Sequence, residues 1–158
     1  LGLPSTVILK ALSIGALAQM VVLVLSGRLA DRIGVIKTVA IGYLVTLILA
    51  FPIFWLVDTR DPQWITLGMV FALGIATIPY APIGNLLSRL FPAHLQYSGL
   101  GLSANLSAVI AGFMPALATQ MLVFSDNQSW GPASLLALIV SISLIGTLLA
   151  GYVTRHDR

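Results

Sequence analysis

Among the polar side chains within the long apolar stretches of this 158-residue sequence are Lys10, Tyr80, Asn85 and Asn105. Each can donate a hydrogen bond, and Lys10 also carries a formal charge. Polar groups are costly in apolar surroundings unless they face other protein groups or a water-filled cavity. These four residues are therefore candidate contacts for a small polar molecule held in an interior cavity.

The composition indicates that the elements carrying these residues are membrane helices. Hydrophobic residues make up 58% of the sequence and charged residues 8%, against roughly a quarter charged in soluble domains. This scarcity of charge excludes a cytosolic enzyme and a nucleic-acid-binding protein, and the absence of Cys excludes a disulfide-stapled secreted domain. The sequence has no His cluster, Cys pair or phosphate-binding loop, so we expect no enzyme activity, no metal site and no cofactor.

Five apolar stretches are long enough to cross a membrane as helices, which takes about 20 residues each. None of them alternates apolar and polar residues with a period of two, which disfavours a membrane β-barrel. The predicted fold is therefore an all-α, polytopic membrane helical bundle that forms a single domain over residues 1–158. The predicted spans are residues 5–26, 36–57, 64–87, 97–124 and 132–153.

Basic residues predict the orientation of the bundle, because Lys and Arg collect on the cytoplasmic side. Arg60 stands alone in the connections at one end, whereas six basic residues lie at the other end. Those six are Arg28, Arg32, Lys37, Arg89, Arg155 and Arg158. We therefore expect the N-terminus of this segment outside and the C-terminus in the cytoplasm. Trp55, Trp64 and Trp130 then lie near the outer boundary, where interfacial aromatic residues collect.

The five spans differ in polarity. The first, third and fourth contain the polar candidates, whereas residues 45–57 and 135–153 are almost wholly apolar. We therefore expect the first, third and fourth spans to line an interior and the second and fifth to face lipid. Small residues four apart in the fourth span predict close packing against a neighbouring helix. These are Gly99, Ser103, Ser107 and Ala111.

Each polar candidate also has a plain structural interpretation. The aliphatic stem of Lys10 can carry its ammonium to the membrane boundary, and Asn105 can form a hydrogen bond that joins two helices. Tyr80 lies between Pro79 and Pro82. This pair of prolines either exposes backbone carbonyls to a ligand or forms a structural kink packed against a neighbour. The sequence leaves these alternatives open.

The segment 27–34, between the first two spans, reads Gly-Arg-Leu-Ala-Asp-Arg-Ile-Gly. It resembles the cytoplasmic loop motif of the major facilitator superfamily, Gly-x-Leu-x-Asp-Arg-x-Gly-Arg-Arg, without the final basic pair. The matching residues are Gly27, Leu29, Asp31, Arg32 and Gly34. In that superfamily the motif acts as an inner-face latch that steadies the outward-open state, and a generic positively charged turn is the alternative.

The residue types in this motif predict its local roles. We expect Gly27 to allow close helix packing and Gly34 to allow a tight turn. We expect Asp31 to cap the start of the following helix or to pair with a basic residue across the inner face.

A second segment, residues 90–99, is similar to a loop and helix start in the metabolite:proton symporter branch of the superfamily. The pattern there is Glu-Leu-Phe-Pro-x-x-x-Arg-Tyr-Ser/Thr-Gly. Arg89 stands in place of the Glu, and Gln96 stands in place of the Arg. This exchange predicts a substitute ion pair between Arg89 and Asp31.

The resemblance covers nearly the whole chain and aligns its five spans with helices eight to twelve of a twelve-helix transporter. It implies secondary active transport of a small polar metabolite, an organic acid or a zwitterionic osmolyte, coupled to protons and driven by alternating access. It also implies a location in the plasma (inner) membrane of a prokaryote. The implied partners are the lipid bilayer, the metabolite, protons and the missing N-terminal helical half, with no nucleic acid.

No Asp, Glu or His lies within a predicted span, so we expect the proton site in the missing half. The alternative to a transporter is a membrane protein that transports nothing: an assembly subunit, a receptor or a truncated remnant.

Overall fold

The computed structural model describes residues 5–59 and 61–156. Within these residues the chain forms five α-helices and no strand, which confirms the predicted all-α fold. The helices are α1 (Ser5–Ile33), α2 (Val35–Asp58), α3 (Pro62–Ser88), α4 (Gln96–Phe124) and α5 (Trp130–His156). Each is long and apolar enough to cross a membrane. Each helix contains the whole of the corresponding predicted span and extends beyond it by one to seven residues at one or both ends.

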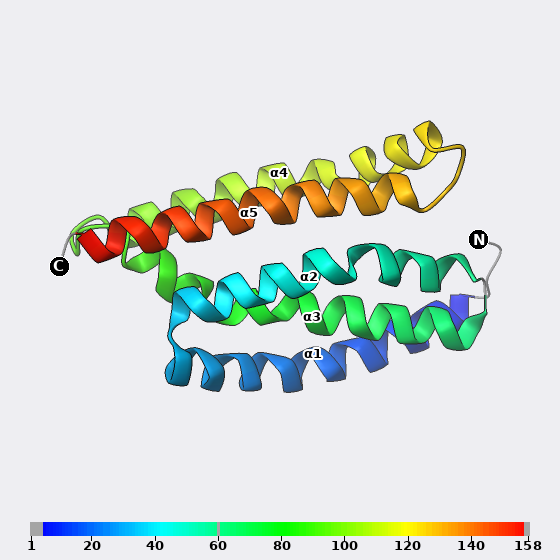
Figure 1. The fold of residues 1–158 in the computed structure, drawn as a ribbon, viewed down its shortest axis with the longest axis horizontal. Coiled ribbons are helices and arrows are strands. Elements are labelled where there is room, and N and C mark those ends of the chain that lie inside the picture. The colour runs from blue at the N-terminus through cyan, green and yellow to red at the C-terminus, as the bar shows by residue number, and fades with distance from the viewer. Residues whose placement is uncertain (1–4, 60, 157–158) are drawn as a thin grey trace.

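Consecutive helices run in opposite directions, so the bundle has two ends (Figure 1). The basic end, defined by Arg32 and Arg89, holds the α1–α2 junction and the α3–α4 loop. The tryptophan end, defined by Trp55, Trp64 and Trp130, holds the α2–α3 and α4–α5 connections. The predicted separation of basic residues from tryptophans is therefore present in the fold.

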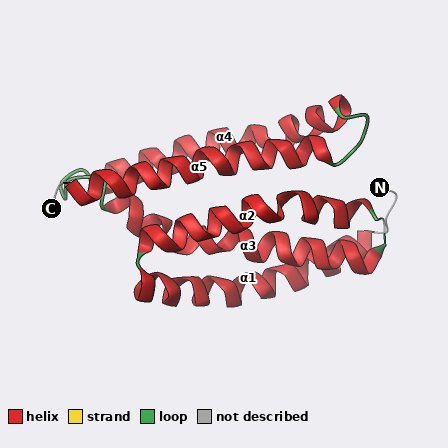
Figure 2. Ribbon diagram, in the orientation of Figure 1, coloured by secondary structure: helices red, strands yellow, loops and turns green. Residues whose placement is uncertain are grey.

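The helices form two groups. Figure 2 shows α4 and α5 as a pair beside α1, α2 and α3. Helix α3 packs along both α1 and α2, and α2 also contacts α5. A small buried core of Ala30, Val35, Val39 and Leu86 joins α1, α2 and α3 at the basic end. No residue of α4, all of which is described, is buried.

Local sequence explains where the helices begin. Asp61 caps α3, its side chain accepting a hydrogen bond from the backbone N–H of Gln63 at 2.9 Å, and Pro62 occupies the first turn, where a missing N–H costs nothing. Gly34 alone separates α1 from α2, with a φ of +97° that favours glycine. The prediction of a tight turn at Gly34 is confirmed.

The contacts of α2 differ from those expected from the polarity of its span. Helix α2 buries one face, which carries Thr38, Gly42, Thr46 and Ala50, against its neighbours. Its other face exposes an apolar stripe, made of Ile41, Leu44, Ile48, Phe51 and Trp55. Only this exposed stripe suits contact with lipid. The expectation that α2 faces lipid was therefore right for one face of the helix and wrong for the other. The reason is that small residues allow close packing whatever the mean polarity of a helix.

Candidate functional site

The proline pair in α3 is held by a hydrogen bond from another helix. Helix α3 continues through Pro79 and Pro82, and both are buried. Because Pro82 has no N–H, the carbonyl of Ile78, four residues earlier, lacks its usual helical donor. The buried hydroxyl of Ser26 on α1 donates to this carbonyl at 2.5 Å. A side chain of α1 thus replaces the missing backbone donor.

The other contact of this segment is with α2. A Cβ atom added to Gly42 would lie 2.6 Å from Cδ of Pro79 and 2.8 Å from its backbone nitrogen. The two helices can approach this closely only because residue 42 has no side chain. Of the two interpretations of the proline pair, the structure therefore supports packing against neighbours, and the carbonyl of Ile78 is not open to a ligand.

Tyr80 projects from a different face of α3. Its side chain is 71% exposed. Ala76 and Gly84, one turn to either side, are exposed as well, and no atom lies within 4 Å of a Cβ built on Gly84. Residues four apart share one helix face. The ring of Tyr80 is thus accessible on an open face of α3 with small neighbours above and below it.

Asn85 and Arg89 bind each other. The Nε of Arg89 donates to Oδ1 of Asn85 at 3.0 Å, and both residues are exposed at the basic end. Within the described part of the chain, no ion pair joins Arg89 to Asp31. The predicted Asp31–Arg89 pair is therefore absent from this structure, because residues four apart on one helix make a nearer partnership.

Asn105 makes only a local contact. Its Nδ2 donates to the carbonyl of Gly101 at 2.8 Å, one turn earlier in α4, and its side chain is exposed. The interhelical hydrogen bond considered for this residue is not formed in the described structure. The small-residue stripe of α4 is also not packed as expected, since Ser107 and Ala111 border a mainly apolar cavity of about 590 Å³ between α2, α4 and α5.

Lys10 lies at the tryptophan end, far from Tyr80. With Pro62, Gln63 and Thr66 it lines an open cavity of about 440 Å³ beside the start of α3. Thr66 and Tyr80 are 14 residues apart, which is about 21 Å along a helix. The four polar candidates are therefore not gathered around one point.

The motif of residues 27–34 belongs mainly to a helix. Gly27–Ile33 form the last two turns of α1, so the prediction of a loop between spans was wrong except at Gly34. The reason is that no helix-breaking residue follows Gly27 until Gly34 is reached. No atom lies within 4 Å of a Cβ built on Gly27, so the close packing predicted there is absent.

The exposed residues of the motif do not cap α2. Leu29, Asp31 and Arg32 are all exposed. Helix α2 has Gly34 at its N-cap, with no side-chain hydrogen bond, so the capping role predicted for Asp31 is not seen. The motif instead presents its polar side chains on the surface of a helix end.

The sequence did not predict the two contacts that hold the α3–α4 loop in place. The Nε2 of Gln96 donates to the carbonyl of Ser88, the last residue of α3, at 3.0 Å. A Cβ added to Gly99 would lie 2.6 Å from the ring of Phe91, so this ring packs on the first turn of α4. The replacement of the family's Arg by Gln96 was the available signal, because Gln keeps a side-chain donor.

Several transporters are related to this chain. A glycine betaine/proline/ectoine/pipecolic acid transporter of Dickeya dadantii is 34% identical over 138 residues, which is 87% of this chain and 27% of that protein. An inner membrane metabolite transport protein of Escherichia coli is 30% identical over 162 residues, covering 99% of this chain and 36% of that protein. A proline/betaine transporter of Escherichia coli is 30% identical over 138 residues, covering 87% and 27% respectively.

The chain thus spans about a third, or less, of the length of these relatives. No family model matches it. No solved structure matches it. The long sequence matches agree with the resemblance carried by residues 27–34 and 90–99 and with five helices suited to a membrane. The chain is an integral membrane protein, and its relatives along most of its length are metabolite and proline/betaine transporters of the major facilitator type.

Proposed function

We propose that this chain is part of a secondary transporter that moves a small polar metabolite by alternating access. The observation that supports this proposal is the similarity to named transporters along 87% to 99% of the chain. Two of those names include proline and betaine, which are zwitterions. A zwitterionic osmolyte is therefore favoured over an organic acid as the substrate class.

The chain acts, in this proposal, together with helices that precede it in a longer protein. It spans only 27% to 36% of the three relatives, and the resemblance assigns its helices to positions eight to twelve of twelve. Helix α4, with no buried residue along its described length, and the 590 Å³ cavity beside it offer an apolar surface for such helices. The basic end faces the cytoplasm and the tryptophan end faces outward.

Tyr80 is the substrate contact that the geometry supports best. Its ring is exposed on an open face, and the face of an aromatic ring attracts an ammonium group. Asn85 is bound to Arg89, and Asn105 is bound to its own helix backbone. Lys10 lies beside the start of α3, away from Tyr80, and its proposed role is therefore in substrate entry.

We also propose that transport is coupled to protons. The described Asp residues, Asp31, Asp58, Asp61 and Asp126, all lie at or near helix ends rather than midway along a span. The proton-carrying group is accordingly placed in the part of the transporter that this chain does not contain.

Uptake into proteoliposomes tests the function directly. The protein expressed from its complete gene is reconstituted, and uptake of labelled glycine betaine, proline, ectoine and succinate is measured with and without a proton gradient. We expect uptake of at least one zwitterion, stimulated by the gradient. If correctly inserted protein moves no member of the panel, the alternative of a non-transporting membrane protein is favoured.

A variant series then tests Tyr80. Removal of a cation–π contact in Tyr80→Ala is expected to raise the KM about tenfold, whereas Tyr80→Phe keeps the ring and stays near wild type. Tyr152→Ala, which alters a similarly exposed tyrosine on α5, is the matched control. Equal uptake by Tyr80→Ala and wild type would remove Tyr80 from the site.

A further inference from the structure

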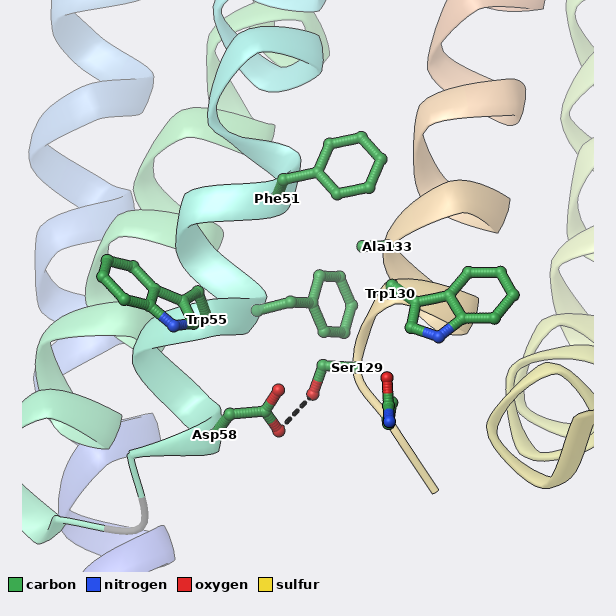
Figure 3. Close-up of a pocket in the computed structure, with 8 residues that line it drawn as sticks. Phe51, Trp55, Asp58, Ser129, Trp130 and Ala133 are labelled. Atoms are coloured by element: carbon green, nitrogen blue, oxygen red, sulfur yellow. Dashed lines mark hydrogen bonds between the residues drawn. The ribbon is translucent and has the colours of Figure 1, made fainter. Parts of the chain in front are cut away.

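A pocket with a mainly aromatic lining and one carboxylate lies at the tryptophan end, away from Tyr80. It has a volume of about 340 Å³ and opens between the end of α2 and the start of α5 (Figure 3). Its lining residues are Phe51, Phe54, Trp55, Asp58, Gln128, Ser129, Trp130 and Ala133. Tyr80 is 18 residues along α3 from Pro62, where α3 begins at this end, or about 27 Å.

The charge of this pocket is negative. Asp58 is the last residue of α2 and is the one charged side chain among the described residues that line the pocket. The hydroxyl of Ser129 donates to Oδ1 of Asp58, and Figure 3 shows the two side chains facing each other across the gap between the helices. This bond orients the exposed carboxylate, and Oδ2 has no partner among the described residues. An oriented, accessible carboxylate oxygen suits a cationic ligand with N–H donors.

Aromatic side chains line the pocket above the carboxylate and stand at its rims. Phe51 projects from α2 toward α5, and Trp55 and Trp130 stand at the two rims with their rings turned outward (Figure 3). Trp55 is 75% exposed and Trp130 is 55% exposed. Exposed indoles at the ends of membrane helices lie at the level of lipid headgroups. The pocket is therefore at the depth where a headgroup would meet Asp58.

The exposed stripe of α2 continues from this pocket toward the middle of the bundle. Ile41, Leu44, Ile48 and Phe51 recur every three or four residues along one helix face. An acyl chain lying on this stripe would place its headgroup beside Asp58. This continuity distinguishes a lipid from a free osmolyte, which would have no use for an apolar track outside the pocket.

We propose that the pocket binds the ammonium headgroup of a zwitterionic phospholipid such as phosphatidylethanolamine. Asp58 accepts a hydrogen bond from the ammonium, the exposed indoles of Trp55 and Trp130 lie at the level of the headgroup, and the α2 stripe holds an acyl chain. The site is independent of transport, because it requires only that the five helices span a bilayer.

Native mass spectrometry of the delipidated protein, expressed from its complete gene, tests the site. Phosphatidylethanolamine and phosphatidylglycerol, matched in their acyl chains, are titrated separately and the apparent Kd values are compared. We expect a preference for phosphatidylethanolamine in wild-type protein. Asp58→Asn is expected to reduce it about fivefold, the scale of an exposed ion pair. Asp126→Asn, in the adjacent connection at the same end, is the control that keeps the preference.

Charge reversal gives a result that loss of folding cannot imitate. In Asp58→Lys the preference is expected to turn toward the anionic phosphatidylglycerol. An unchanged lipid preference in both Asp58 variants would overturn the proposal. A final arm adds glycine betaine at increasing concentration: retention of the bound lipid supports the lipid assignment, and stoichiometric displacement would overturn it in favour of a free osmolyte.

Discussion

The hydroxyl of Ser26 on α1 donates a hydrogen bond to the carbonyl oxygen of Ile78 on α3, the same carbonyl that Pro82 leaves without a helical donor. The two residues are 52 positions apart in the sequence. A proline that would weaken an isolated helix therefore becomes a point of attachment between two helices. Pro79 is likewise a point of attachment, because its ring packs directly against Gly42 of α2.

Removal of the Ser26 hydroxyl is expected to destabilise the bundle. Ser26→Ala leaves the partly buried carbonyl of Ile78 unsatisfied, which lowers the free energy of unfolding by about 1–3 kcal/mol. The measurement is equilibrium unfolding in detergent, followed by circular dichroism. Ser13→Ala, which removes an exposed hydroxyl bound to its own helix, is the control and should remain near wild type.

A second background shows whether the effect depends on the proline. Pro82→Ala restores a backbone N–H that can bond to Ile78, so Ser26→Ala should cost less in that background than in wild type. An identical cost in both backgrounds would mean that Ser26 acts through something other than the carbonyl of Ile78.

Gly42→Ala is expected to force α2 away from α3. Its new methyl group would lie 2.6 Å and 2.8 Å from ring and backbone atoms of Pro79, neither of which can rotate away. Overpacking of this kind lowers the free energy of unfolding by about 1–3 kcal/mol. Gly146→Ala on α5, where no atom lies within 4 Å of the added carbon, is the matched control. A Gly42→Ala variant as stable as the control would contradict this contact.

The inner-face pairing can be decided by charge exchange. Arg89→Glu is expected to reduce uptake, because it removes the donor that binds Oδ1 of Asn85 and reverses the charge at the basic end. Since Arg89 does not pair with Asp31 here, the double variant Arg89→Glu/Asp31→Arg should transport no better than Arg89→Glu alone. Recovery of uptake in the double variant would show that the two residues meet in another state of the transport cycle.

Neutral Asp variants of this chain are expected to keep proton coupling. The four described Asp residues lie at or near helix ends, and a carboxylate there is not midway along the path of a proton across the membrane. Each single variant should still change the pH of the proteoliposome lumen in step with substrate uptake. The variants are Asp31→Asn, Asp58→Asn, Asp61→Asn and Asp126→Asn. One Asp variant that binds substrate but moves no protons would place the proton site in this chain. Asp31→Asn is the first to measure, since its place in the motif can alter the rate without altering the ratio of protons to substrate.

Runs of apolar residues were enough to predict the five helices, because hydropathy over some 20 residues reports directly on a membrane span. Hydropathy does not predict which residues contact one another. The role of the proline pair depended on Ser26 and Gly42, which belong to other helices. The role of Arg89 depended on whether Asn85 lay closer than Asp31. Span polarity misjudged α2 for the same reason, since its buried face includes small residues, Thr38, Gly42, Thr46 and Ala50, whose packing hydropathy does not report.

The helical form of the motif gives the basic end of α1 a mechanical property. With 29 residues α1 is about 43 Å long, whereas the hydrocarbon core of a bilayer is about 30 Å thick. The turns that carry Asp31 and Arg32 therefore stand on a stiff extension rather than on a slack connection. A tilt of α1 by about 10° around its centre would carry these residues sideways by about 3 Å. The extension works as a lever arm, which converts a small rotation within the bilayer into the making or breaking of contacts beyond it.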